Sequence, residues 1–89
     1  MTKKDLIELV ARKAHLTKKA ANEAVETFLG EVTRALVKGE KVIISGFGTF
    51  DVDQRKEKTM YLRGKAEKVS PHRVPRFHPG KTLRRTIKK

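Results

Sequence analysis

The chain has 89 residues, no cysteine, and 22 Lys and Arg against 10 Asp and Glu, which gives a formal net charge of +12. A single domain of this length buries only about 60 to 65% of the surface that its unfolded chain exposes. Without cysteine it has no disulfide framework and no thiolate metal site, so we expect it to gain stability by forming a dimer.

The positive charge is concentrated in the second half of the chain. Residues 1–40 carry eight Lys and Arg against six acidic residues, whereas residues 41–89 carry 14 against four. A surface this basic attracts polyanions, and nucleic acid is a stronger candidate for the partner than an anionic membrane. No stretch is apolar for long enough to be a secretory h-region or to cross a bilayer. We therefore expect a soluble cytoplasmic protein with no membrane partner.

Two helices are predicted in the first half. Thr2 is a candidate N-cap with Asp5 three residues on, and apolar residues at helical spacing predict a helix over residues 3–14. Thr17 is the next candidate N-cap. A long apolar stripe after it stops at Lys38 and Gly39, which predicts a second helix over residues 18–38.

Strand-forming residues follow Gly39. They predict two strands, over residues 41–44 and 48–55, joined by a glycine-containing turn. The basic, apolar-poor segment after Asp53 predicts a long hairpin arm, about 54–72, with its turn near Arg63-Gly64-Lys65. A third strand is expected over residues 74–77, at a sheet edge or bulge because Pro75 cannot donate to a ladder.

A short basic helix is expected to close the chain over residues 81–88, starting after Pro79 and Gly80. Leu83 and Ile87 would form its inner face. The predicted fold class is α+β: two N-terminal helices, a three-stranded antiparallel sheet extended into a β-ribbon arm, and a short C-terminal helix. We expect one domain over 1–89, with a helical dimerisation part (1–38), the sheet with its arm (39–78) and the basic helix (79–89).

The order of these elements and two motifs resemble the bacterial HU/IHF family of histone-like DNA-binding proteins. The motifs are Gly46-Phe47-Gly48-Thr49-Phe50 and Val74-Pro75-Arg76-Phe77 followed by Pro79-Gly80-Lys81, and the likeness covers nearly the whole chain. The resemblance implies an intertwined dimer, with itself or a paralogue, whose two β-ribbon arms wrap double-stranded DNA along the minor groove. It also implies association with the nucleoid and places Phe47, Phe50 and Phe77 in the core under the sheet.

The arm tip departs from the family pattern. In the family a Gly-x-Asn-Pro-x-Thr-Gly tip supplies a proline wedge, whereas this chain has Thr59-Met60-Tyr61-Leu62-Arg63-Gly64-Lys65, and its arm is about two residues shorter. Met60, Tyr61 or Leu62 could replace the wedge. Alternatively the three pack locally and DNA is coated without a kink. We favour local packing, and therefore weaker bending than in typical family members.

The predicted DNA-contacting residues combine cations with the two turn glycines. Gly46 and Gly48 allow a tight reversal through positive φ and a close backbone approach to DNA, while cations along the arm and at helix starts neutralise phosphates. The set is Lys3, Gly46, Gly48, Arg55, Lys56, Lys58, Arg63, Lys65, Lys68, Arg73, Arg76, Lys81, Arg84 and Arg85, with Met60, Tyr61 and Leu62 as the candidate wedge.

No residue pattern indicates catalysis, a cofactor or a small-molecule substrate. His15, His72 and His78 share no metal-ligand spacing, and Asp51 and Asp53 alone are weak evidence for a metal site. Two other functions remain as alternatives: a basic RNA- or ribosome-associated protein, which charge alone would allow, and a purely structural dimerisation module, which leaves the basic second half unexplained. We expect a sequence-tolerant, architectural DNA-binding protein that is not an enzyme.

Overall fold

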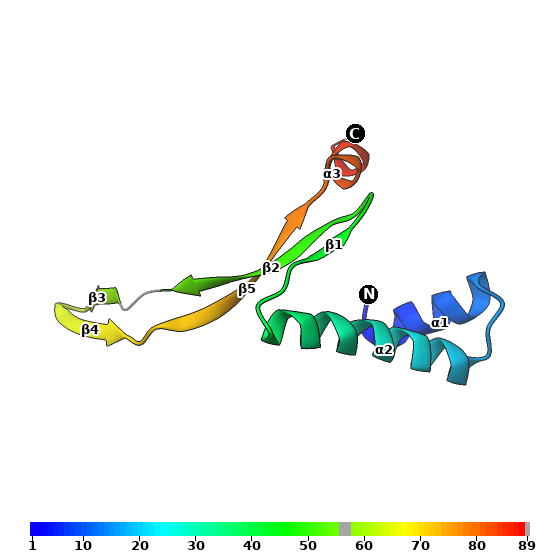
Figure 1. The fold of residues 1–89 in the computed structure, drawn as a ribbon, viewed down its shortest axis with the longest axis horizontal. Coiled ribbons are helices and arrows are strands. Elements are labelled where there is room, and N and C mark those ends of the chain that lie inside the picture. The colour runs from blue at the N-terminus through cyan, green and yellow to red at the C-terminus, as the bar shows by residue number, and fades with distance from the viewer. Residues whose placement is uncertain (56–57, 89) are drawn as a thin grey trace. The chain divides into compact units, whose positions relative to one another are not determined.

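The computed structural model describes residues 1–55 and 58–88, and for Arg55, Lys58, Met60, Leu62 and Val69 it describes the backbone alone. The elements in chain order are α1 (Lys3–Lys13), α2 (Lys18–Val37), β1 (Val42–Ile44), β2 (Gly48–Arg55), β3 (Lys58–Leu62), β4 (Lys65–Val69), β5 (His72–Pro79) and α3 (Lys81–Ile87) (Figure 1). The predicted α+β fold class is confirmed. The chain divides into two compact units, Met1–Arg34 and Ala35–Lys89.

The first unit is a pair of helices whose starts are capped as predicted. Thr2 Oγ1 accepts a hydrogen bond from the Asp5 N–H at 3.2 Å, and the Asp5 carboxylate accepts one from the Thr2 N–H at 2.9 Å. Thr17 Oγ1 likewise accepts from the Ala20 N–H at 3.0 Å. These side chains satisfy N–H groups that a helix start otherwise leaves unpaired.

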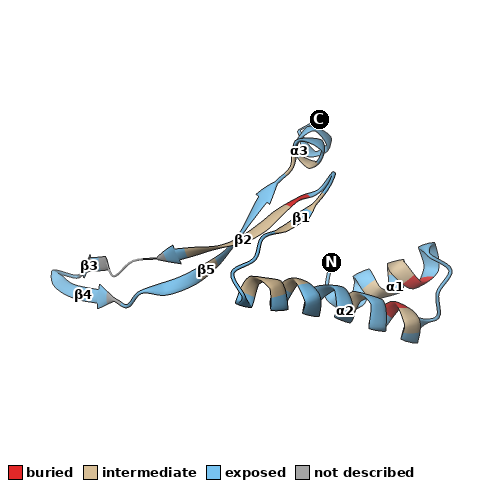
Figure 2. Cartoon of the chain, in the orientation of Figure 1, coloured by how far each residue is buried: buried red, intermediate tan, exposed pale blue. Residues whose placement is uncertain are grey.

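The first unit buries little of its apolar surface. Ala11 and Ala21 are the apolar side chains that the structure describes as buried (Figure 2). Larger apolar side chains in the same unit stay exposed, among them Phe28 at 53% and Leu6 at 45%. Two alanines contribute little hydrophobic free energy, so a large apolar face of the helix pair lacks a covering partner within the unit.

The second unit contains an antiparallel sheet in the order β1-β2-β5. The β1–β2 register runs from Val42 opposite Phe50 to Ile44 opposite Gly48. The β2–β5 register runs from Gly48 opposite Pro79 to Arg55 opposite His72. β5 is thus longer than the predicted 74–77. It lies at the sheet edge, which confirms the position inferred from its proline at residue 75.

Two glycines shape the turn between β1 and β2, for different reasons. Gly46 has a φ of 81° with open space around it, so its backbone conformation favours glycine. Gly48 has no positive φ, contrary to the prediction. A Cβ at this position would lie 2.6 Å from the His78 carbonyl oxygen and from the Phe77 ring. Gly48 is therefore required by close packing between β2 and β5.

The three predicted core phenylalanines form one cluster. The Phe77 ring centroid lies 4.8 Å from that of Phe50 and 5.3 Å from that of Phe47, in tilted arrangements. Phe47 and Phe77 nevertheless stay 44% and 39% exposed. The cluster fixes one face of the sheet, but a single chain does not bury it.

The arm contains a second, two-stranded sheet. β3 and β4 pair antiparallel from Lys58 opposite Val69 to Leu62 opposite Lys65. Arg63 and Gly64 form the two-residue connection, with φ values of 55° and 78°. Positive φ at both positions is typical of a type I′ turn, whose twist matches that of the flanking strands. The predicted turn position is confirmed.

The C-terminal helix α3 begins at Lys81, with Gly80 as an N-cap that makes no side-chain hydrogen bond. Pro79 ends β5 and the helix starts after Gly80, as predicted. Leu83 is half-buried, but Ile87 is 72% exposed, so the expectation that both form an inner face is wrong for Ile87. None of the helices that the structure describes has the length and apolar character needed to cross a bilayer.

We predict opposite residue preferences at the two turn glycines. At Gly46, asparagine should be tolerated better than alanine, because asparagine adopts positive φ more readily. At Gly48, asparagine should be worse than alanine, because every added atom enters the space between Phe77 and His78. Overpacking of this kind typically costs about 1–3 kcal/mol. Urea unfolding of the four single variants measures this, and the same preference order at both sites would contradict the packing argument.

Candidate nucleic-acid interface

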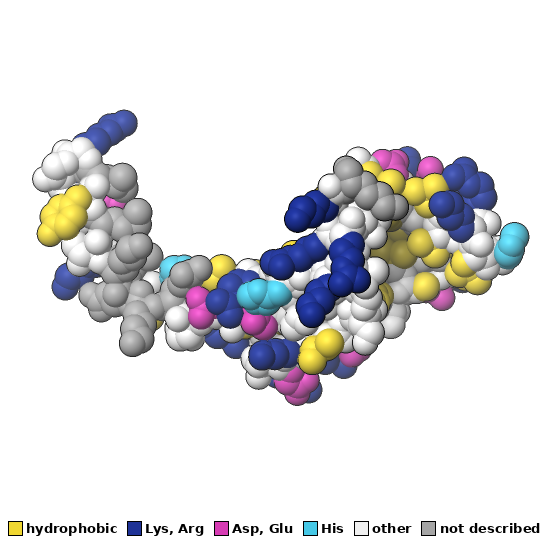
Figure 3. Space-filling model, turned by 90° about the horizontal axis from the view of Figure 1, so that it is seen from above, with side chains coloured by type: hydrophobic (Ala, Val, Ile, Leu, Met, Phe, Trp, Pro, Cys, Tyr) yellow, Lys and Arg dark blue, Asp and Glu magenta, His cyan; other side chains and the backbone are white. Residues whose placement is uncertain are grey.

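Three cations extend from one side of α3. Lys81 is followed at three and four residues by Arg84 and Arg85, a spacing that places their side chains on the same helix face. Figure 3 shows dark blue side chains gathered over this helix. Among the described residues no ion-pair partner is found for these three, and all are exposed. Their charge is therefore available to an external anion.

A second group of cations lies along the arm. Arg63 is at the turn, and Lys65 and Lys68 are exposed residues of β4. Of the other predicted arm cations, Arg55 ends β2 and Lys58 begins β3, but their side chains lie outside the described part of the structure. Lys56 lies outside it altogether. The described arm residues thus present cations on the turn and on β4.

The candidate wedge is described in full only for Tyr61. Its side chain is 77% exposed, and its partner across the ladder is the small residue Ala66. The side chains of Met60 and Leu62 lie outside the described residues. The exposed ring of Tyr61 is available to a ligand, and the choice between local packing and a wedge at the tip stays a prediction.

Arg73 has a partner inside its own unit. Its Nη1 donates to the carbonyl oxygen of Val37 at 2.9 Å. Val37 ends α2, and its carbonyl is one of those left without an intrahelical donor. Arg73 therefore fastens β5 to the last turn of α2, a structural role that the sequence analysis did not assign to it.

Arg76 lies opposite Asp51 in the β2–β5 register and forms a bidentate pair with it. Arg76 Nε is 3.0 Å from Asp51 Oδ1, and Nη2 is 3.1 Å from Oδ2. These hydrogen bonds hold the pKa of the Asp51 carboxyl below its usual range and raise the pKa of Arg76. The pair stays ionised at neutral pH.

Two further residues complete this cluster. Arg76 Nη1 is 3.6 Å from Asp53 Oδ2, and His78 Nε2 is 3.1 Å from Asp51 Oδ2. Asp51 is only 13% exposed, whereas Arg76 is 40% exposed. Sequence reasoning missed this cluster. Aligning the two strand motifs antiparallel, with Gly48 opposite Pro79, would have placed Asp51 beside Arg76.

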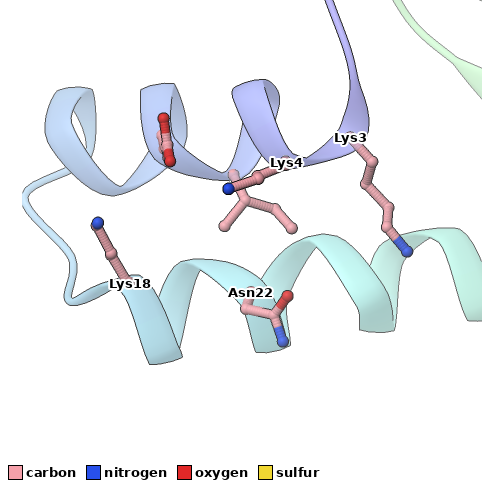
Figure 4. Close-up of a pocket in the computed structure, with 6 residues that line it drawn as sticks. Lys3, Lys4, Lys18 and Asn22 are labelled. Carbon is pink, nitrogen blue, oxygen red and sulfur yellow. The ribbon is translucent and has the colours of Figure 1, made fainter.

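Lys3 belongs to the first unit, where its ammonium is 2.6 Å from Glu26 Oε1 on α2. Beside it is an open hollow of about 400 Å³ between α1 and α2, lined by Lys3, Lys4, Ile7, Glu8, Lys18 and Asn22. In Figure 4 the Lys18 side chain extends from α2 toward α1. Three lysines and one glutamate line the hollow, so its lining carries an excess of positive charge.

The structure gives no metal site among the residues it describes: nowhere in 1–55 or 58–88 do three or more His, Asp or Glu side chains gather around one point. The turn glycines, Gly46 and Gly48, lie at the β1–β2 end of the sheet. Any contact between them and DNA stays a prediction.

Comparison with known proteins points to one family. The family model described as "Bacterial DNA-binding protein" matches residues 1–88. The DNA-binding protein HU of Thermotoga maritima is 44% identical over 91 residues, covering 99% of this chain and 100% of the relative. HU of Thermus thermophilus is 41% identical, covering 100% of this chain and 94% of the relative.

Solved structures agree with these relatives. The Anabaena HU–DNA cocrystal structure matches with a TM-score of 0.91 and 32% identity, covering 98% of this chain and 97% of that chain. HU from Thermotoga maritima matches with a TM-score of 0.73 and 39% identity, covering 98% of both chains. The fold of this chain and that of the DNA-bound Anabaena protein are therefore closely similar.

Proposed function

Because this chain belongs to the family of bacterial DNA-binding proteins, we propose that it binds double-stranded DNA with little sequence preference and shapes or compacts it as an architectural protein. The observation that best supports this proposal is the similarity, over almost the whole chain, to the structure of HU in a DNA cocrystal. The family is described by DNA binding rather than by a reaction. Association with the nucleoid follows from this activity.

Phosphate contacts are proposed for cations of α3 and the arm that have no ion-pair partner among the residues the structure describes. On α3 these are Lys81, Arg84 and Arg85, and on the arm Arg63 and Lys65. Lys68 is exposed on the same strand as Lys65, and Arg55, Lys56 and Lys58 remain predicted contacts. Lys3 would have to share its ammonium with Glu26. Phosphate neutralisation supplies most of the affinity in non-specific DNA binding.

We further propose that the functional unit is a dimer. The described apolar core of the first unit consists of Ala11 and Ala21, while Phe28, Leu29 and the Phe47–Phe77 pair remain exposed in a single chain. A second copy covering these side chains would supply the missing buried area. Residues 1–38 would then serve dimerisation, and residues 39–78 and 79–89 would serve DNA binding within one domain.

Phe28→Ser is expected to destabilise the protein strongly, although Phe28 is 53% exposed in one chain. Loss of a buried phenylalanine costs about 3–5 kcal/mol, and a dimer would bury this ring. Tyr61→Ser is the matched control, because its ring is 77% exposed on the arm and its loss should leave stability unchanged. Thermal unfolding at several protein concentrations measures both. A wild-type midpoint independent of concentration would contradict an obligate dimer.

The affinity for duplex DNA should fall steeply with salt. If a dimer makes ~6 to 10 phosphate contacts, log K against log salt has a slope of about −5 to −9. Replacing Lys81, Arg84 and Arg85 by glutamine should make the slope shallower by about 1 for each phosphate that is no longer neutralised. The matched control replaces Arg12, Lys13 and Lys19 on the helix pair, which removes the same charge. Fluorescence anisotropy at several salt concentrations measures the slopes.

A wild-type slope near −2 would overturn the electrostatic account of binding. If the control triple variant makes the salt slope shallower by the same amount as the α3 triple variant, net charge rather than the α3 face governs the affinity. Duplex RNA of the same length serves as competitor, since its A-form grooves differ from those of B-form DNA. Preferential binding of RNA would favour an RNA-associated function instead.

The exposure of Tyr61 bears on how the arm meets DNA. A tyrosine that is 77% exposed at the arm tip, opposite an alanine, has an open ring face. Base–aromatic stacking is worth about 1–3 kcal/mol per base. We propose that Tyr61 stacks on a base step where family members use a proline, and that the bend it supports is weaker.

Tyr61→Ala should reduce DNA bending, while Tyr61→Phe should preserve it because the stacking ring remains. Thr59→Ala, two residues away on β3, is the control and should leave bending unchanged. Fluorescence transfer between dyes at the ends of a short duplex reports the bend. Strong bending that survives alanine at Met60, Tyr61 and Leu62 together would show that the tip does not produce it.

A further inference from the structure

The guanidinium of Arg76 lies beside two carboxylates of its own sheet, those of Asp51 and Asp53. Its Nε and Nη2 bind Asp51 at 3.0 and 3.1 Å, and its Nη1 is 3.6 Å from Asp53. An arginine has five N–H donors arranged in a planar fork. Each of the three nitrogens of Arg76 therefore has an acidic neighbour.

This cluster lies on the polar face of the β2–β5 ribbon. The register places Asp51, Asp53, Arg76 and His78 on one face. Phe50 and Phe77, whose rings contact each other, lie on the opposite face. The polar face is thus the one left for a charged ligand, and its described part holds two carboxylates against one guanidinium. It is not cationic, unlike α3 and the arm.

An arginine binds carboxylate and phosphate with the same bidentate fork. Asp51 occupies the position on Arg76 that a DNA phosphate would need, and a phosphate approaching it would meet the negative charge of both aspartates. Building on the proposed DNA binding, we infer that Asp51 is an intramolecular competitor that withholds Arg76 from DNA and lowers the affinity of this face. DNA contacts are then confined to the arm and α3.

The alternative interpretation is that the Arg76–Asp51 pair only stabilises the fold and has no effect on DNA binding. Removing either partner of such a pair would alter the free energy of unfolding and leave the salt dependence of DNA binding unchanged. A competitor predicts an asymmetry instead. Loss of Asp51 should strengthen DNA binding, loss of Arg76 should have little effect, and loss of both should cancel the gain.

The test compares wild type with Asp51→Asn, Arg76→Gln and the double variant on one duplex at pH 7, by anisotropy between 50 and 200 mM salt. Asparagine keeps the size of the side chain and removes its charge. Asp51→Asn should bind more than about threefold tighter at 50 mM and steepen the slope by about 0.9 for each additional phosphate that is neutralised. The ratio of the Asp51→Asn affinity to the wild-type affinity should then fall about 3.5-fold between 50 and 200 mM salt if one further phosphate is neutralised. It should fall about 12-fold if one further phosphate is neutralised per subunit.

Glu31→Gln is the matched control. Glu31 pairs with Arg34 on α2 at 3.6 Å, so this change also removes one negative charge beside an arginine. Its affinity should stay within about twofold of wild type, with an unchanged slope. An equal gain from Glu31→Gln would overturn the inference, because the effect would then come from net charge.

Two further outcomes would also overturn the inference. One is a slope of log K against log salt for Asp51→Asn equal to that of wild type. The other is a slope for Arg76→Gln alone that is shallower than that of wild type by about 1. Circular dichroism establishes that each variant is folded. Should Asp51→Asn not fold, the slope of Arg76→Gln still decides between competitor and contact. Wild type that fails to bind DNA at 50 mM salt would refute the proposed function itself, which separates that failure from failure of this inference.

Discussion

The close approach of the Phe77 ring to Gly48 determines how β2 lies against β5, and the functional surfaces depend on that register. With Gly48 opposite Pro79, Asp51 lies opposite Arg76, and β5 ends where α3 begins. A slip of one residue would turn the side chains of the shifted strand to the opposite face. Phe77 would then no longer share a face with Phe50, and Arg76 would no longer share one with Asp51. A glycine and a phenylalanine far apart in sequence therefore orient the charges of the second unit.

Local signals in the sequence were sufficient for most of the fold. Each helix cap, at Thr2 and Thr17, and the turn at Arg63-Gly64 depend only on residues close in sequence, so all three could be predicted from the sequence. The ends of the helices differed from the predicted ones by a single residue. Frayed helix ends explain a difference of that size.

Non-local contacts were not predictable in the same way. The Arg73–Val37 hydrogen bond and the Arg76–Asp51 pair join residues from different elements, and composition says only that arginines are present. A basic residue in a basic segment was therefore counted as a DNA contact without knowledge of its partner. The exposure of Tyr61 could not be decided from the sequence for a related reason, since it depends on which residue the strand register places opposite it.

The tight turn at Arg63-Gly64 limits how the length of the arm can vary. Because two residues with positive φ connect the strands directly, an insertion in only one strand must form a bulge or shift the register. Adding one residue to each strand would keep the ladder but turn every side chain beyond that point to the opposite face. During evolution, arms of this kind can keep the orientation of their tips only by gaining or losing residues in twos on both strands.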